Sequence, residues 1–176
     1  AQKARRIFDT LELPAPGRPY VLRADTDVHS MLVFYALLAA HVPMLLLSPK
    51  LTEAEVRSYI RAAQAIDEPL PEDAAVVIFT SGTTGPSKPA VLSRRALAAN
   101  ALAVGRHIEM TSEDIWLLSL SAARVGGLGI LTRSLCIRSA VCIGPKYTAK
   151  NFVEQLERDR ITIASLVPTM LTDVLE

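Results

Sequence analysis

The sequence predicts an α/β fold in which a layered, largely parallel sheet is flanked by helices. Short apolar runs alternate with longer helical patterns from one end of the chain to the other. Runs such as VVIF and ITIASLV are apolar at consecutive positions, which is typical of strands covered on both faces. Half of the 176 residues are hydrophobic, so the chain can bury a sizeable core without disulfides or metals.

The first elements follow from the apolar runs near the N-terminus. YVLR, residues 20–23, predicts a strand, and Val28–Ala40 predicts a helix. The apolar stretch 31–47 is interrupted by His41 and Pro43 and is shorter than the roughly 20 residues that a spanning helix needs. It therefore predicts the end of the helix and then a strand, and we expect no membrane span.

The remaining elements are assigned by the same patterns, together with helix-capping signals. Thr52 and Glu55 have the spacing of a capping box, and Ser93 and Thr148 can each cap the helix that follows. The predicted strands are Tyr20–Arg23, Met44–Leu47, Ala75–Thr80, Ala90–Leu92, Trp116–Leu120, Ala140–Ile143 and Ile161–Leu166. The predicted helices are Val28–Ala40, Glu53–Ala65, Arg94–His107, Gly127–Arg138, Ala149–Arg158 and Thr169–Leu175.

Two segments bear on domain organisation. DEPLPED, residues 67–73, is rich in proline and acid; it is a possible surface linker, although an ordinary loop is favoured. The closing VPTMLTDVLE predicts a helix without a glycine cap, and the closing strands of a sheet of this size cannot be assigned. We therefore expect residues 1–176 to be a partial domain cut from something longer.

Composition excludes several classes of protein. The chain carries 19 Lys and Arg against 18 Asp and Glu, which excludes a disordered chain and argues against a nucleic-acid binder. Cys136 and Cys142 lack the spacing of a zinc or redox site and are expected to be small buried residues. The N-terminus has no sustained apolar run of the secretory kind. A reduced, cytoplasmic location fits these observations.

The chemically informative segment is VVIFTSGTTGPSKPAVLS, residues 76–93. Two glycines allow a sharp turn and a close approach of the backbone to a ligand. Clustered hydroxyls and the ammonium of Lys88, with no acidic residue among them, suit a polyanion such as phosphate. A surface turn rich in Ser, Thr and Gly is the plainer alternative, which the buried strand and the lysine disfavour. The spacing is not that of a Walker A loop, because Lys88 follows Ser87 and precedes Pro89.

TSGTTGPSK resembles the phosphate loop of adenylate-forming enzymes, the superfamily of acyl-CoA synthetases, luciferases and adenylation domains. AVLSRRALAAN (90–100), LLSLSAARVGGLGILTRSL (117–135) and ITIASLVPTML (161–171) resemble later segments of the same large domain. The resemblance covers most of residues 20–176 and implies the N-terminal part of that domain. VGGLGILTRSL and ALLAAHVPMLLLSPKLT are most similar to o-succinylbenzoate–CoA ligases of menaquinone synthesis.

The resemblance implies a two-step reaction. Such enzymes use ATP and Mg²⁺ to convert a carboxylic acid to acyl-AMP, and then transfer the acyl group to CoA. Ser81, Thr83, Thr84 and Lys88 would hold the β- and γ-phosphates, with Lys88 as the catalytic group that offsets charge on the leaving pyrophosphate. The implied nucleotide site comprises Thr80, Ser81, Gly82, Thr83, Thr84, Gly85 and Lys88. The implied substrate site comprises Arg124, Gly126 and Gly127.

The sequence departs from the family pattern at both sites. Ser87 and Pro89 stand where the family has Pro and Gly around the lysine. In the acyl-pocket segment, Ala123 replaces an aromatic residue and Arg124 replaces a histidine. Arg124 can bind a substrate carboxylate with two donors, and a solvated loop arginine is an equal alternative. His29, His41 and His107 lie far apart in the sequence, and structural roles are favoured for each.

The family's adenine-binding, Mg²⁺-binding, hinge and catalytic-lysine motifs lie downstream of the Val-Pro-Thr segment, so we expect these 176 residues to be inactive alone. Two alternatives to the ligase remain open. One is a non-catalytic α/β module that keeps a nucleotide-binding loop. The other is an adenylation domain that loads a carrier protein instead of CoA.

Overall fold

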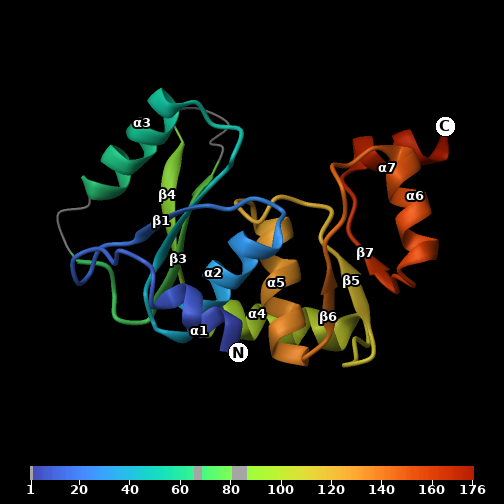
Figure 1. The fold of residues 1–176 in the computed structure, drawn as a ribbon, viewed down its shortest axis with the longest axis horizontal. Coiled ribbons are helices and arrows are strands. Elements are labelled where there is room, and N and C mark those ends of the chain that lie inside the picture. The colour runs from blue at the N-terminus through green and yellow to red at the C-terminus, as the bar shows by residue number, and fades with distance from the viewer. Residues whose placement is uncertain (1, 66–68, 81–86) are drawn as a thin grey trace. The chain divides into compact units, whose positions relative to one another are not determined.

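The computed structural model describes residues 2–65, 69–80 and 87–176, and its contacts divide the chain into two compact units, Ala1–Ala96 and Leu97–Glu176. The predicted α/β class is confirmed, because strands and helices alternate along the chain (Figure 1). The strands do not form one sheet, however. Among the described residues, the first unit holds a four-stranded sheet and the second a three-stranded sheet.

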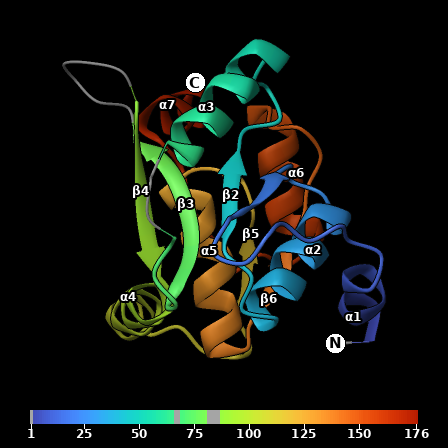
Figure 2. The same cartoon turned by 90° about the vertical axis from the view of Figure 1, so that its left-hand side faces the viewer.

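The first sheet has the order β1-β2-β3-β4, formed by Tyr20–Arg23, Met44–Leu47, Ala74–Thr80 and Lys88–Ser93. β1, β2 and β3 are parallel, while β4 runs antiparallel to β3. Figure 2 shows β4, β3 and β2 side by side in this order. The predicted strand Ala90–Leu92 was too short, because the ladder with β3 extends it to include Lys88.

Three helices of the first unit accompany this sheet: α1 (Gln2–Phe8), α2 (Val28–Ala39) and α3 (Glu53–Gln64). α2 and α3 lie on opposite sides of the sheet (Figure 1), which explains why β2 is buried along its whole length. α1 was not predicted. It has no buried residue, so it lacks the apolar stripe from which a helix is recognised.

The ends of these helices follow from local hydrogen bonds. The side chain of Asp27 accepts from the Ser30 amide and caps α2, and His41 in the left-handed region (φ 61°) turns the chain into β2. At α3 the predicted capping box is confirmed: Thr52 and Glu55 each accept a hydrogen bond from the other's amide.

The core under α3 is apolar throughout. Leu45, Leu47, Val77 and Phe79 point from alternate positions of β2 and β3 toward Val56 and Ala63 of α3. The rings of Tyr59 and Phe79 meet edge to face, with centroids 4.3 Å apart. This cluster fixes the end of β3 that leads to the predicted phosphate loop.

Of the possible linker 67–73, residues 67 and 68 lie outside the described residues. The rest is tied to the first unit: the Leu70 amide donates to the Gly17 carbonyl (3.1 Å), and the Asp73 carbonyl accepts from the Arg94 amide (2.9 Å). The guanidinium of Arg94 also donates to the Ala74 carbonyl (2.8 Å). These bonds hold the residues just before β3 against the first unit.

The second unit is built on a parallel sheet of order β6-β5-β7, formed by Ala140–Cys142, Ile115–Leu117 and Ile163–Ala164. Its helices are α5 (Val125–Ile137), α6 (Ala149–Arg158) and α7 (Pro168–Leu175), and α4 (Arg94–His107) links the two units. Ser93 and Thr148 cap α4 and α6 as predicted, accepting from the Ala96 and Asn151 amides at 3.1 Å each.

The prediction of a fully buried strand at Ile161–Leu166 was wrong. β7 is two residues long, and its side chains alternate between half-buried and exposed. It is the end strand of its sheet, so its outer side has no strand to pair with in the described part of the chain. No helix within the described ranges is long and apolar enough to cross a bilayer.

Candidate functional site

The β3–β4 hairpin brings two of the predicted nucleotide-site residues together. β3 is buried from Ala74 to Phe79, and Thr80 is its first exposed residue. Thr80 pairs directly with Lys88 at the start of β4, and its hydroxyl donates to the Lys88 carbonyl (3.4 Å). The other predicted residues of this site, Ser81, Gly82, Thr83, Thr84 and Gly85, lie outside the described residues.

The Thr80–Lys88 pair presents a hydroxyl and an ammonium on the same face of the sheet, since directly opposed residues of an antiparallel pair share a face. Lys88 is exposed, and none of the salt bridges among the described residues involves it. An exposed lysine beside a hydroxyl can donate hydrogen bonds to an anion. The sequence from Thr80 to Lys88 contains no acidic residue that would repel one.

The predicted substrate-site residues form the first turn of α5. This helix begins at Val125, two residues earlier than predicted, and Arg124 is its N-cap residue. Arg124 and Gly126 are exposed, whereas Gly127 is buried. The Arg124 side chain makes no capping hydrogen bond, and its amide donates to the Ser121 carbonyl (3.0 Å). The guanidinium therefore does not cap α5.

Gly127 is required by packing. A Cβ at this position would overlap the carbonyl oxygens of Leu120 and Ser121, because the first turn of α5 lies directly against the segment that follows β5. Ala122 and Ala123, just before this helix, are also buried. The close approach explains the glycine without reference to a substrate.

The sequence did not reveal a hydrogen-bond network at the carboxyl end of β5. The indole of buried Trp116 donates to the Ser165 hydroxyl (3.2 Å), and the Ser119 hydroxyl donates to the Ser165 carbonyl (2.5 Å). These residues are separated by 46 and 49 positions, so no local pattern could have indicated the pairs. The network joins the segment before Arg124 to the segment after β7.

The predicted residues thus form two groups. Thr80 and Lys88 belong to the unit Ala1–Ala96, and Arg124, Gly126 and Gly127 belong to the unit Leu97–Glu176. The structure brings the members of each group together.

The two cysteines differ from the expectation that both are buried. Cys136 is exposed, because it lies on a face of α5 that the core does not cover, so this prediction was wrong. Cys142 is half-buried, and its sulfur accepts from the side-chain amide Nε2 of Gln155 (3.4 Å) and donates to the Asp159 carboxylate (3.5 Å). Burial raises the pKa of the Cys142 thiol, which disfavours the reactive thiolate. Across the described ranges, no three His, Cys, Asp or Glu residues gather as metal ligands would.

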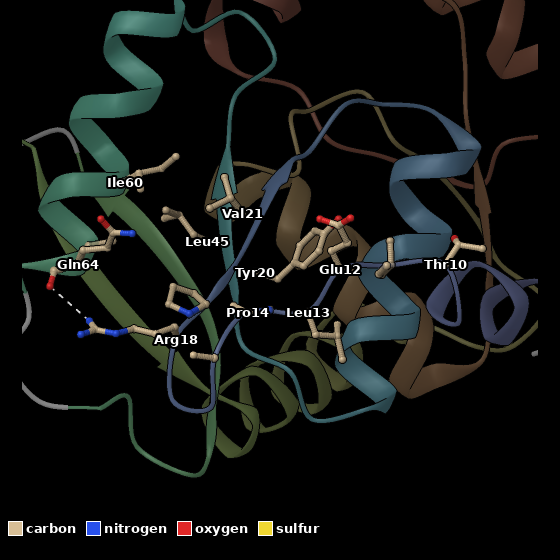
Figure 3. A pocket seen from close by; sticks show the side chains of 14 residues that line it. Thr10, Glu12, Leu13, Pro14, Arg18, Tyr20, Val21, Leu45, Ile60 and Gln64 are labelled. Carbon is tan, nitrogen blue, oxygen red and sulfur yellow. Dashed lines mark hydrogen bonds between the residues drawn. The ribbon is translucent and has the colours of Figure 1, made fainter.

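A cavity of about 800 Å³ opens in the first unit beside β1 and α3 (Figure 3). Its floor includes Val21, Leu45 and Ile60, and Arg18 at its rim donates to the Gln64 carbonyl (3.3 Å). None of the predicted site residues that the structure describes lines this cavity.

The chain is similar to a known protein family and to proteins of established name. Residues 61–176 match the family model described as AMP-binding enzyme. The 2-succinylbenzoate–CoA ligase of Bacillus mycoides is 33% identical over 129 residues, which are 73% of this chain and 27% of that protein. That of Bacillus cereus strain Q1 is 34% identical over 105 residues, covering 60% of this chain and 22% of the relative. The chain thus spans about a quarter of the length of the curated relatives it matches.

Solved structures show the same fold. O-succinylbenzoate CoA synthetase of Bacillus subtilis, in complex with the acyl-adenylate intermediate OSB-AMP, superimposes with a TM-score of 0.84 at 18% identity, covering 99% of this chain and 56% of that one. ATP-bound MatB from Rhodopseudomonas palustris gives a TM-score of 0.79 at 21% identity, covering 99% and 44%.

Proposed function

Because the chain belongs to the AMP-binding enzyme family, we propose that it forms the phosphate-binding part of an AMP-forming acid–CoA ligase. In the proposed reaction a carboxylate attacks the α-phosphate of ATP and releases pyrophosphate, and the acyl group of the resulting acyl-AMP then passes to the thiol of CoA. The observation that carries the proposal is the segment TSGTTGPSK, with Thr80 and Lys88 paired at its two ends.

The proposed role of Lys88 is electrostatic. Negative charge grows on the pyrophosphate as the bond to the α-phosphate breaks, and a fixed ammonium stabilises that charge. The Thr80 hydroxyl, on the same face of the hairpin, is a further donor. By resemblance, Ser81, Thr83 and Thr84 complete the phosphate contacts, and Gly82 and Gly85 give them backbone room. Mg²⁺ enters this proposal with ATP, as the counter-ion of its phosphates.

The proposed carboxylic acid is o-succinylbenzoate, which would make the ligase an enzyme of menaquinone biosynthesis. The names of the relatives support this substrate. The exposed guanidinium of Arg124 supports it too, because o-succinylbenzoate keeps a second carboxylate after the first is activated. In this proposal Gly126 and Gly127 shape the wall beside that group. A cytoplasmic location completes the proposal, supported by two cysteines that are both free thiols.

The phosphate-binding part of the proposal can be tested on this chain with inorganic tripolyphosphate as the probe. We expect calorimetry to show binding, and Lys88→Ala to weaken it about tenfold or more, as for the loss of a charge-assisted hydrogen bond. Lys50→Ala is the matched control, because Lys50 is also exposed in the first unit and lies outside the hairpin. The absence of binding, or equal affinities of all three proteins, would refute the phosphate site.

The reaction itself is tested on the full-length protein. Pyrophosphate release that depends on o-succinylbenzoate, followed by loss of the free thiol of CoA, is the expected result. Tripolyphosphate binding without any pyrophosphate release would instead identify a non-catalytic nucleotide-binding module. Acyl-AMP formation with a carrier protein as the only thiol acceptor would identify an adenylation domain.

A further inference from the structure

We propose that Pro89 is a positioning residue that holds the backbone of Lys88 in the conformation from which its ammonium binds phosphate. The inference rests on the proposed function of the TSGTTGPSK segment. In the adenylate-forming pattern that this segment resembles, the position of Pro89 is occupied by glycine. Glycine has the greatest backbone freedom of all residues, whereas proline has the least.

The first support is local geometry. The ring of a proline clashes with the preceding residue in helical conformations and restricts it to extended ones. Lys88, which precedes Pro89, is the extended first residue of β4. Two further contacts restrict Lys88: the pairing with Thr80, and the hydrogen bond from the Thr80 hydroxyl to the Lys88 carbonyl. The proline therefore reinforces a conformation that the hairpin already uses.

The second support is the way the hairpin is anchored. Pro89 lies opposite Phe79 and shares its face of the sheet, the face that α3 covers. Phe79 is 9% exposed and packs against the ring of Tyr59. Lys88 lies opposite exposed Thr80 and so on the other face. The hairpin is thus anchored through Phe79 on the face that Pro89 shares, while the lysine side chain is presented on the opposite face.

The third support is that the sheet tolerates a proline here. β4 ends the order β1-β2-β3-β4, and proline occurs in sheets at such outer strands, where its missing N–H interrupts no ladder. The substitution of a proline for a more flexible residue lowers the freedom of the chain without loss of a hydrogen bond. A lysine that is already ordered loses less freedom when it binds an anion, which raises its affinity.

The test is a double-mutant cycle with tripolyphosphate as the probe. We expect Pro89→Gly to weaken binding about two- to fivefold, the size of a single backbone-entropy effect. In the Lys88→Ala background the same substitution should cause no further loss, because Pro89 acts through Lys88. Pro16→Gly is the matched control: it makes the same chemical change at an exposed site of the first unit and should leave the affinity unchanged.

Each other binding result contradicts the inference in a different way. Wild-type affinity of Pro89→Gly means that the restriction of Lys88 is unimportant. An equal loss with and without Lys88 means that Pro89 supports the fold and not the lysine. If Pro89→Gly fails to fold, Pro89→Ala replaces it, since alanine keeps a Cβ on the Phe79 side, and the same non-additivity is required. Failure of the wild-type chain to bind tripolyphosphate refutes the proposed phosphate site itself, and with it this inference, and is thereby told apart from failure of the positioning role.

Discussion

Gly127 has no room for a side chain, which gives a prediction at the scale of one residue. A Cβ would meet the backbone carbonyls of Leu120 and Ser121, and backbone cannot move aside as a flexible side chain can. We expect Gly127→Ala to lower the free energy of unfolding by about 1–3 kcal/mol, measured by urea denaturation. Gly126→Ala is the control, because its Cβ meets only side-chain atoms of Leu120. Equal stability of the two variants would contradict this account.

Arg124 can be tested by its geometry instead of its charge. Replacement by lysine keeps the charge and removes the planar, two-donor fork that matches a carboxylate. In the full-length ligase we expect Arg124→Lys to lower kcat/KM about tenfold for o-succinylbenzoate, as for a weakened charge-assisted pair, and much less for the analogue without the second carboxylate. Tripolyphosphate affinity should not change. Equal losses for both acids would show that Arg124 does not read the second carboxylate.

At the scale of an element, the capping box of α3 makes stability depend on pH. The Thr52 amide, and then its hydroxyl, hold the pKa of the Glu55 carboxyl below its usual value. Because the pKa is lowered in the folded chain, the bond stabilises the fold above the unfolded pKa and is lost as pH falls through the folded one. We expect Glu55→Ala, which removes the carboxylate that accepts from the Thr52 amide and hydroxyl, to unfold at a lower temperature than wild type at pH 7. The difference from wild type in thermal unfolding should shrink below pH 4.5. A difference that stays constant with pH would show that the charge of Glu55 does not stabilise the cap.

The elements that the sequence predicted correctly are those defined by local signals. Met44–Leu47 is a continuous apolar run after Pro43, and Glu53 follows a capping threonine, so both boundaries could be read from neighbours in the chain. α1 offered no such signal, because none of its residues is buried. The length of β7 depended on pairing with β5, about 47 residues away, which no local pattern reports.

The same division holds for the candidate site. Lys88 was recognised because hydroxyls, glycines and a cation cluster within nine residues of sequence. That Lys88 belongs to a strand, opposite Thr80, required the hairpin register, which depends on the antiparallel ladder with β3. The hydrogen bonds from Trp116 and Ser119 to Ser165 join segments that are distant in the sequence, so no local pattern could predict them.

At the scale of the whole molecule, 129 of these 176 residues align with 27% of the length of a relative such as the Bacillus mycoides ligase. We expect the chain to fold, because both units bury apolar side chains, and to lack turnover by itself. Circular dichroism with a cooperative thermal transition checks the first part. Carboxylate-dependent pyrophosphate release at about 1 s⁻¹ or more, a typical enzymatic rate, would contradict the second.

The position of β4 at the end of its sheet also affects how copies of the chain meet one another. The outer row of amides and carbonyls on an end strand is a template on which a second chain can add a strand, the first step of aggregation. Pro89 removes one donor from that row, and Lys88 places a charge beside it. The proposed phosphate-binding lysine and the proline proposed to position it therefore also protect this edge against pairing between molecules. A variant that changes both of them is expected to be harder to keep in solution than either single variant.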